Sequence, residues 1–365
     1  MFLKNGQKMK KFIIISIVIL ALAGLAVFQI VFNSVKTITL SEKNYEWVET
    51  PLSISANKYF WGQFHQGNYD SIPAILEKLT SAYLDNPNDI RTITHLAFTH
   101  MWAISEHQNS SNPRLIEHAT LAQKYFGESY GMNSNDTRVL SFLSSAKLVN
   151  GSISNDDGLL KDGYLNGLKA IREWKDFSAF SLGYTLSRLP HTDEKFQEAV
   201  KLMGNLASGY GENFNPKSSA TQQTISEMKI LENTHMTKDR VFYNSWVAPH
   251  NIEGFFMVYG DMLVKNGEWE DATEIYKLAR FSAQYDSWDY KDILENRIIN
   301  AKANVELFRK EIPRNQKSEI GKAMLVQTKI SCRSCHQMST TDKERFFTGY
   351  DESKLLTKNF YLLKQ

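Results

Sequence analysis

Apolar residues recur at helical spacing along the chain from about residue 53, whereas runs that alternate apolar and polar positions are almost absent. Proline, which interrupts helices, is scarce. The pattern predicts an all-α body over residues 53–310, with a linker before it at 33–52 and a C-terminal segment after it at 311–365. Polar residues gather at 150–158 and 207–224, and we expect loops in both places.

A set of six residues recurs 47 positions later in the chain and indicates an internal repeat. The residues Tyr83, Asn86, Asn88, Asp89, Arg91 and Leu96 recur as Tyr130, Asn133, Asn135, Asp136, Arg138 and Leu143. Each copy contains an Asn-x-Asn-Asp cluster, and short polar side chains of this kind form turns and cap helix N-termini. We expect a turn followed by a new helix at each cluster.

The clearest single hairpin lies between residues 254 and 279. Small Gly260 fits a close crossing of two helices, and Gly267 fits the turn between them. Trp269, Ala272, Tyr276 and Ala279 then follow at the spacing of a second helix. In these positions the stretch resembles a tetratricopeptide repeat. The resemblance implies an array of helical hairpins over the body, with a concave face that binds peptides or partner proteins.

The first 32 residues have a different pattern. Four lysines precede an uncharged stretch at 12–32, which is long enough to cross the hydrocarbon core of a bilayer. Positive charge on the N-terminal side predicts a cytoplasmic tail at 1–11 and an exported body. Cleavage after Ala23 would leave an apolar new terminus. We therefore expect an uncleaved signal anchor that crosses the bacterial inner membrane once, with the bulk of the chain in the periplasm.

The only two cysteines of the chain lie in the sequence Cys332-Arg333-Ser334-Cys335-His336. CxxCH is the attachment signature of c-type haem. On a helix the two cysteines and the histidine share one face, so both thiols can bind vinyl groups while the imidazole reaches the iron. The motif predicts one covalent haem c, with thioethers at Cys332 and Cys335 and His336 as an axial iron ligand.

Three other roles of the cysteines stay open: a disulfide between Cys332 and Cys335, a thioredoxin-like redox pair, and half of a zinc site. Zinc needs four convergent ligands, and adjacent residues such as Cys335 and His336 rarely both reach one metal. A thioredoxin-like pair follows a strand, whereas residues 320–330 have the pattern of a helix that runs into the motif. Both observations favour haem.

The motif makes the C-terminal segment resemble the c-type cytochromes. In small cytochromes c the motif lies near the N-terminus and a methionine ligand follows far downstream, but here only 29 residues follow His336. Among them, Met338 lies on the wrong side of the motif, and no later Met or His exists. The late motif is more similar to that of the four-helix cytochromes c′. The resemblance implies an iron that is five-coordinate or takes its sixth ligand from the body.

His250 is the first candidate for this sixth ligand. Pro249 fits the first turn of a helix and would place His250 at the mouth of the repeat array. Met257, one to two turns later, is a second candidate, and His95 with His100 forms another cluster. For each of these residues an ordinary role in the core or at the surface stays open.

Charge is distributed unevenly along the chain. Residues 33–313 carry a net charge of −7, whereas residues 314–365 carry +5. A basic surface beside a haem can steer an acidic redox partner, and the same side chains can equally solubilise the acidic body. We expect a redox partner that is acidic at its docking site, and no nucleic-acid partner.

These observations lead to three functional hypotheses. The first, which we favour, is a membrane-anchored, periplasmic monohaem c-type cytochrome that transfers electrons and docks a partner through its helical body. It is an electron carrier rather than an enzyme, and the chain has no nucleophile elbow, P-loop or HExxH motif. The second is a haem-based gas sensor or peroxidase-like enzyme. The third is an envelope scaffold with a Cys332–Cys335 disulfide.

Overall fold

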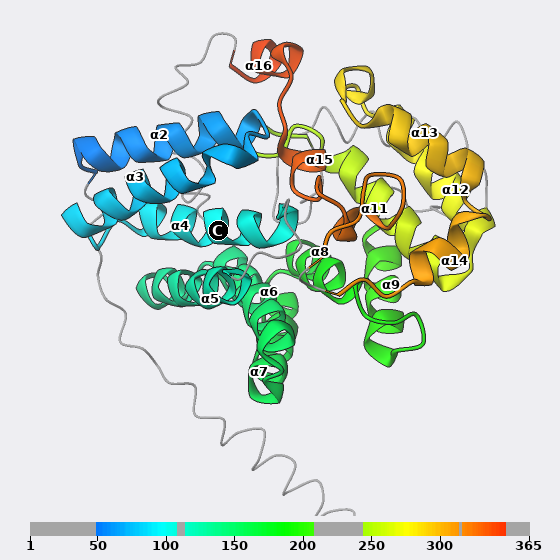
Figure 1. Cartoon of the computed structure of the whole chain (residues 1–365), viewed down its shortest axis with the longest axis horizontal. Helices are drawn as coiled ribbons and strands as arrows, with labels where there is room; N and C mark the ends of the chain where they lie inside the picture. Colours follow the sequence, from blue (N-terminus) through cyan, green and yellow to red (C-terminus); the bar gives the residue numbers. More distant parts are fainter. Residues whose placement is uncertain (1–48, 108–113, 208–243, 314–315, 348–365) are drawn as a thin grey trace, which may run out of the picture. The chain divides into compact units, whose positions relative to one another are not determined.

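The computed structural model describes residues 49–107, 114–207, 244–313 and 316–347. These residues contain 14 α-helices and no strand, which confirms the all-α body (Figure 1). The helices are α2 (Pro51–His65), α3 (Ile72–Asp85), α4 (Ile90–Glu106), α5 (Leu115–Met132), α6 (Thr137–Ser154), α7 (Asp157–Glu173), α8 (Lys175–Leu186), α9 (Glu194–Ala207), α11 (Asn251–Asn266), α12 (Trp269–Leu278), α13 (Lys291–Asn300), α14 (Asn304–Arg309), α15 (Arg333–His336) and α16 (Thr340–Phe347).

Helices that follow one another in the chain pack together as hairpins, for example α4 with α5, α6 with α7 and α11 with α12. They enclose two hydrophobic clusters. The first lies among α2 to α6, and the second among α8 to α14 together with buried residues of the segment 324–330. Cys332 packs against the first cluster. The C-terminal segment therefore joins the two clusters, and the CxxCH motif lies where they meet.

The turns of the internal repeat have the predicted chemistry. Asp89 caps α4 and Asp136 caps α6, and each carboxylate accepts the backbone N–H two residues later at 3.0 Å. The preceding helices also end alike, with φ −140° and ψ 90° at Asn86 and φ −137° and ψ 85° at Asn133. The expected turn and helix start are confirmed at both copies.

The hairpin expected between 254 and 279 is formed by α11 and α12. A Cβ on Gly260 would lie 2.3 Å from the ring of Tyr276, so the two helices cross as closely as the glycine suggests. Gly267 ends α11 at φ +100°, a conformation that favours glycine. Ala272 and Ala279 are fully buried. The close crossing and the turn are therefore confirmed.

The expected loop at 150–158 is wrong, because α6 continues to Ser154 and α7 already begins at Asp157. Asn155 turns the chain at φ 54°, and a Cβ on Gly151 would lie 2.9 Å from the backbone of Leu160. The small and polar residues here are thus explained by a tight turn and by the close approach of α6 and α7, and not by a loop. The second expected loop, 207–224, lies almost wholly outside the described residues.

The expected helix at 320–330 is also wrong. These residues form turns and one short 3₁₀ turn, η5 (Leu325–Gln327). Their backbone is bound by side chains of the body: the N–H of Leu325 donates to Asp261 at 2.6 Å, and the carbonyl of Ala323 accepts from Arg297 at 3.0 Å. Residues 323–326 are all buried. Their run of apolar residues therefore reflects burial of the whole segment and does not indicate a helix.

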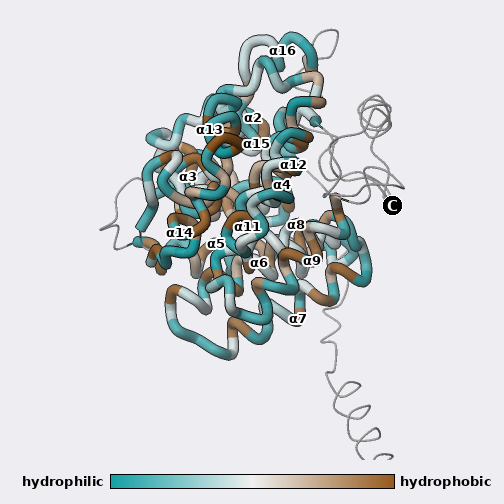
Figure 2. Tube along the Cα trace, turned by 90° about the vertical axis from the view of Figure 1, so that its right-hand side faces the viewer, coloured by the Kyte–Doolittle hydropathy of each residue, from teal (hydrophilic) through white to brown (hydrophobic). Residues whose placement is uncertain are grey.

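The expected membrane anchor at 12–32 lies outside the described residues. Within the described residues, no helix combines the length and apolar character needed to cross a membrane. Most of the labelled helices carry both hydrophobic and hydrophilic positions (Figure 2).

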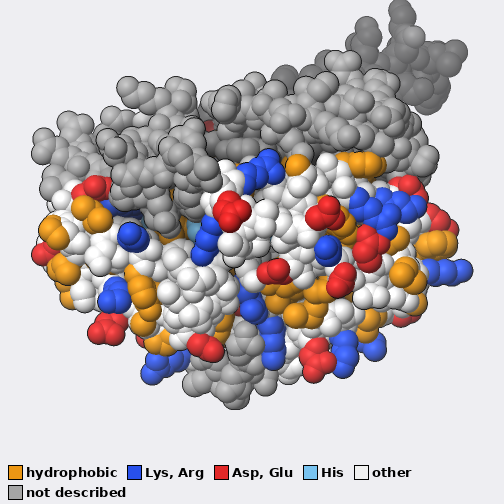
Figure 3. Space-filling view, turned by 90° about the horizontal axis from the view of Figure 1, so that it is seen from above, with side chains coloured by type: hydrophobic (Ala, Val, Ile, Leu, Met, Phe, Trp, Pro, Cys, Tyr) orange, Lys and Arg blue, Asp and Glu red, His pale blue; other side chains and the backbone are white. Residues whose placement is uncertain are grey.

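Charges of both signs are interspersed on the face seen from above, where Lys and Arg side chains lie among Asp and Glu (Figure 3). Within the C-terminal segment, Arg333 pairs with Glu106, and exposed Lys322 pairs with Glu319. Lys329 and Lys343 form no ion pair with described residues. Of these two pairs, only the one between Arg333 and Glu106 sets a positive charge of the segment against a carboxylate of the body.

Candidate functional site: the CxxCH segment

The last four residues of the motif form α15, a single helical turn that contacts both α2 and α11 (Figure 1). Two glycines allow this approach. A Cβ on Gly254 of α11 would lie 2.1 Å from the sulfur of Cys335, and one on Gly67, after α2, would lie 2.5 Å from the side chain of Arg333. The backbone N–H of His336 donates to the carbonyl of Cys332 at 3.1 Å. The two cysteines and the histidine thus share one helical turn.

The imidazole of His336 has one nitrogen oriented by the backbone and one without a partner. Nδ1 lies 2.7 Å from the carbonyl oxygen of Val247, and because a carbonyl only accepts, Nδ1 carries the proton. Burial lowers the pKa of His336, although the Val247 carbonyl opposes this, so the ring is neutral at pH 7. Nε2 forms no hydrogen bond with the described residues. A carbonyl-oriented, neutral imidazole is a common form of a metal-ligating histidine.

The thiols of Cys332 and Cys335 are free and partly accessible. Burial and the nearby carboxylate of Glu106 raise the pKa of Cys332, and burial raises the pKa of Cys335 to about 12. Both thiols are therefore protonated at neutral pH. Redox-active CxxC pairs have lowered thiol pKa values, so this environment disfavours a thioredoxin-like pair.

Glu106, the last residue of α4, binds the start of the motif. One carboxylate oxygen accepts the N–H groups of Cys332 at 2.8 Å and Arg333 at 2.7 Å. The other accepts from Arg333 Nε at 3.0 Å and from the indole of Trp102 at 2.8 Å. The Glu106 side chain is fully buried, and burial raises its pKa even though Arg333 opposes this. The sequence did not indicate this residue, because its partners lie 226 and 227 residues later.

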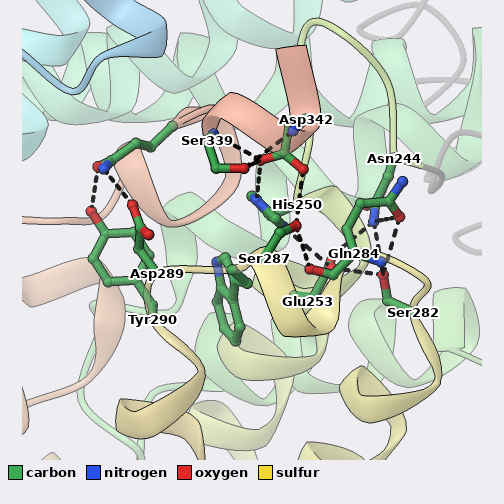
Figure 4. A network of polar contacts seen from close by, with 12 residues as sticks. Asn244, His250, Glu253, Ser282, Gln284, Ser287, Asp289, Tyr290, Ser339 and Asp342 are labelled. Atoms are coloured by element: carbon green, nitrogen blue, oxygen red, sulfur yellow. Dashed lines mark hydrogen bonds and ion pairs between the residues drawn. The ribbon is translucent and has the colours of Figure 1, made fainter. Parts of the chain in front are cut away.

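His250, the first candidate for the sixth ligand, has both ring nitrogens engaged (Figure 4). Nδ1 lies 3.3 Å from the carboxylate of Glu253, and Nε2 lies 3.1 Å from that of Asp342. Burial opposes a charge on this ring, but the hydrogen bonds and charges of the two carboxylates raise its pKa to about 9. In this arrangement neither nitrogen has a lone pair for iron, so the structure does not present His250 as an axial ligand.

The carboxylates that hold His250 are themselves held by polar side chains (Figure 4). Asp342 accepts from Ser339 Oγ at 2.6 Å, and Glu253 accepts from Ser282 Oγ at 2.6 Å. The backbone N–H of His250 donates to the carbonyl of Cys335 at 3.0 Å. The network thus connects α11, α16 and the motif, and its role is structural.

The remaining candidates have neighbours of their own. Met257 is fully buried in the second cluster. His95 Nδ1 lies 2.5 Å from Asn57, and His100 Nδ1 lies 2.8 Å from the ring of His118. His336 forms no hydrogen bond or ring contact with any of these residues in the described part of the chain.

A histidine that the sequence reasoning did not single out lies beside the motif. His65 ends α2, and its backbone carbonyl accepts the N–H of Met338 at 2.8 Å. The ring centroid of the preceding residue, Phe64, lies 4.9 Å from that of His336. His65 is 4 % exposed, and its Nε2 forms no hydrogen bond with any described residue. The sequence carries no signal for this proximity, because it arises from contacts between distant segments.

Comparison of the chain with protein-family models, with curated proteins and with solved structures finds no match in any of the three. Within the described residues, no group of three or more His, Cys, Asp or Glu side chains is placed to hold a metal ion.

Proposed function

We propose that this chain is a membrane-anchored, periplasmic monohaem c-type cytochrome that transfers single electrons. The observation that carries the proposal is the state of His336 within its motif. Its imidazole is neutral, its Nδ1–H is bound to the Val247 carbonyl, and its Nε2 is unpartnered beside two protonated thiols. A haem held here would supply a one-electron iron couple.

The side chains at the motif fit haem c. Cys332 and Cys335 would each add across one vinyl group, the sulfur bonding to one carbon and the thiol hydrogen moving to the other, with no net oxidation. His336 Nε2 would bind the iron. On the neighbouring helix, Nε2 of His65 is buried and has no hydrogen-bond partner among the described residues, and a bound group would satisfy it.

The chain's own residues would position the site and keep water from it. The Val247 carbonyl orients His336, and Glu106 holds the backbone of Cys332. Phe64 is buried against the ring of His336, and Trp102 packs on Phe64 with ring centroids 4.9 Å apart. Apolar surroundings of this kind disfavour the more highly charged oxidised iron and raise the reduction potential.

The proposal includes a redox partner and a membrane location. Lys329, Lys343 and Arg345 form no ion pair with described residues and would face a partner that is acidic at its docking site. The apolar stretch 12–32 would hold the chain at the inner membrane. The helical hairpins of the body would provide a surface for partner docking.

The proposal is tested by covalent haem content. We expect the full chain, produced in a bacterium that matures cytochromes c, to give one band on a denaturing gel that stains for haem peroxidase activity. The purified protein should contain one haem per chain by pyridine haemochrome assay. The stain should vanish in the Cys332→Ala/Cys335→Ala double variant, because thioether bonds alone survive denaturation.

Met338→Leu serves as the matched control, since this buried residue follows the motif but is neither a thioether position nor a proposed ligand. It should stain like the wild-type chain. A folded wild-type chain of correct mass that remains unstained would refute the cytochrome proposal and favour the scaffold hypothesis.

A further inference from the structure

We propose that His65 is the second axial ligand of the haem iron. The inference rests on the proposed function and completes its site. The iron would then be held by two imidazoles, one from α15 and one from the last turn of α2.

The first argument is an unsatisfied buried atom. His65 Nε2 is enclosed by protein and has no hydrogen-bond partner in the part of the chain that the structure describes. Buried polar atoms nearly always have a partner, and leaving one unsatisfied costs about 1–3 kcal/mol. Iron coordination would satisfy that atom.

The second argument is the position of His65 relative to the motif. The backbone of His65 is hydrogen-bonded to Met338, two residues after His336. The ring of Phe64 contacts the ring of His336, and the α2–α3 turn at Gly67 packs against Arg333. The end of α2 is therefore held against the motif on both sides of His65.

The surroundings of His65 differ from those of two other histidines, His250 and His100. His250 donates from both ring nitrogens to carboxylates, and His100 shares its Nδ1 with His118. Aromatic rings pack around His65 instead, with Trp61 at 5.1 Å and Trp246 at 6.1 Å between ring centroids. These aromatic side chains exclude water, which would otherwise compete with His65 for binding to the iron.

The test is spectroscopic and uses the haem-loaded full chain. We expect wild-type ferric protein to be low-spin by electron paramagnetic resonance, with the near-infrared charge-transfer band of bis-imidazole ligation in magnetic circular dichroism. Ferrous protein should bind carbon monoxide slowly, because the ligand must displace an imidazole. A high-spin ferric iron, or a charge-transfer band of histidine–methionine ligation, would overturn the assignment without any variant being made.

Variants then identify the residue. His65→Ala should convert the iron to high-spin and accelerate carbon monoxide binding, and added imidazole should restore the low-spin spectrum. His65→Met should stay low-spin, show histidine–methionine ligation and have a higher reduction potential. If His65→Ala remains low-spin without imidazole, His65 is not the ligand.

His100→Ala is the matched control, because it removes another buried histidine from the same helical group and should leave the spin state unchanged. The haem stain separates this inference from the proposed function. Each histidine variant should still stain, since the thioethers are intact. A stained protein with the wrong ligation overturns only the role of His65, whereas an unstained wild-type chain overturns the cytochrome itself.

Discussion

At the scale of single residues, three histidines in and near the motif differ in what surrounds their nitrogens. His336 faces one carbonyl, which leaves a neutral ring with a defined tautomer. His250 faces two carboxylates, which favour the imidazolium. His65 Nε2 forms no hydrogen bond with the described residues. The hydrogen-bond acceptors that the fold places around an imidazole therefore decide its role. A histidine can have a fixed tautomer, form an ion pair, or keep a nitrogen available to bind a metal.

Glu106 is the residue on which the position of the motif most depends. We expect Glu106→Gln to lower the free energy of unfolding by about 3 kcal/mol, because it breaks a buried ion pair and leaves Arg333 without its carboxylate. Urea unfolding followed by circular dichroism measures this loss. Haem content should also fall, since the N–H groups of Cys332 and Arg333 lose their charged acceptor.

The matched control is Glu306→Gln, which removes an exposed carboxylate that pairs with Arg309. An exposed pair contributes little, so a change of less than about 0.5 kcal/mol is expected. Equal effects of the two substitutions would contradict the role assigned to Glu106.

At the scale of elements, the motif is a helical turn too short to be stable alone, and its neighbours hold it in place. Trp288 donates its indole N–H to the carbonyl of Ser334 at 2.7 Å, and Tyr290 donates to Gln337 at 2.6 Å. The helix that follows, α16, is held to α11 by the ion pair between Asp342 and His250. Position and orientation of α15 and α16 thus come from tertiary contacts.

The His250 ion pair makes the attachment of α16 dependent on pH. The pKa of His250 is raised from 6.5 to about 9, so its contribution to stability is complete below about pH 6.5 and is lost as the pH rises through about 9. The pKa of Asp342 is lowered below 3.8, so its contribution is present above that value and is lost as the pH falls. Wild-type stability should therefore fall between pH 6.5 and 9 by up to about 3 kcal/mol.

The measurement is urea unfolding at pH 6 and pH 9.5 for the wild type and for His250→Gln. The variant should be less stable at pH 6 and should approach the wild type at pH 9.5. His191→Gln, in the turn before α9, is the control and should follow the wild-type profile. A constant difference between wild type and His250→Gln across this range would show that the ion pair does not cause the dependence.

At the scale of the whole molecule, the described residues belong to one compact unit, and the C-terminal segment links its two hydrophobic clusters. Met324, Leu325, Val326 and Ile330 lie in the second cluster, whereas Cys332 packs on the first. Because the C-terminal segment packs on both clusters, unfolding of one cluster would remove contacts that hold the motif in place. It would also weaken the packing of the segment on the other cluster.

This connection predicts one cooperative unfolding transition for the described body. Scanning calorimetry should give equal calorimetric and van 't Hoff enthalpies. Asp261→Asn should lower the melting temperature without splitting the transition, because Asp261 pairs with Arg297 and accepts from Leu325 in the buried linking segment. Two resolved transitions in the wild type would contradict the linking role.

The sequence by itself determined the features that depend on neighbours in the chain. Helical periodicity gave the all-α body, Asp89 and Asp136 marked their caps, and Gly260 marked a close crossing. The spacing of Cys332, Cys335 and His336 placed three groups on one helical turn. Each of these follows from local geometry, in which backbone dihedrals and side-chain spacing act over a few residues.

Only the tertiary structure decided which distant groups meet the motif. It placed Glu106 at the start of α15, paired His250 with Asp342, and brought His65 to the segment that follows His336. It also bound residues 320–330 through Asp261 and Arg297 rather than as a helix. Such contacts depend on how whole helices pack, and no periodicity or spacing along the chain encodes which side chains they bring together.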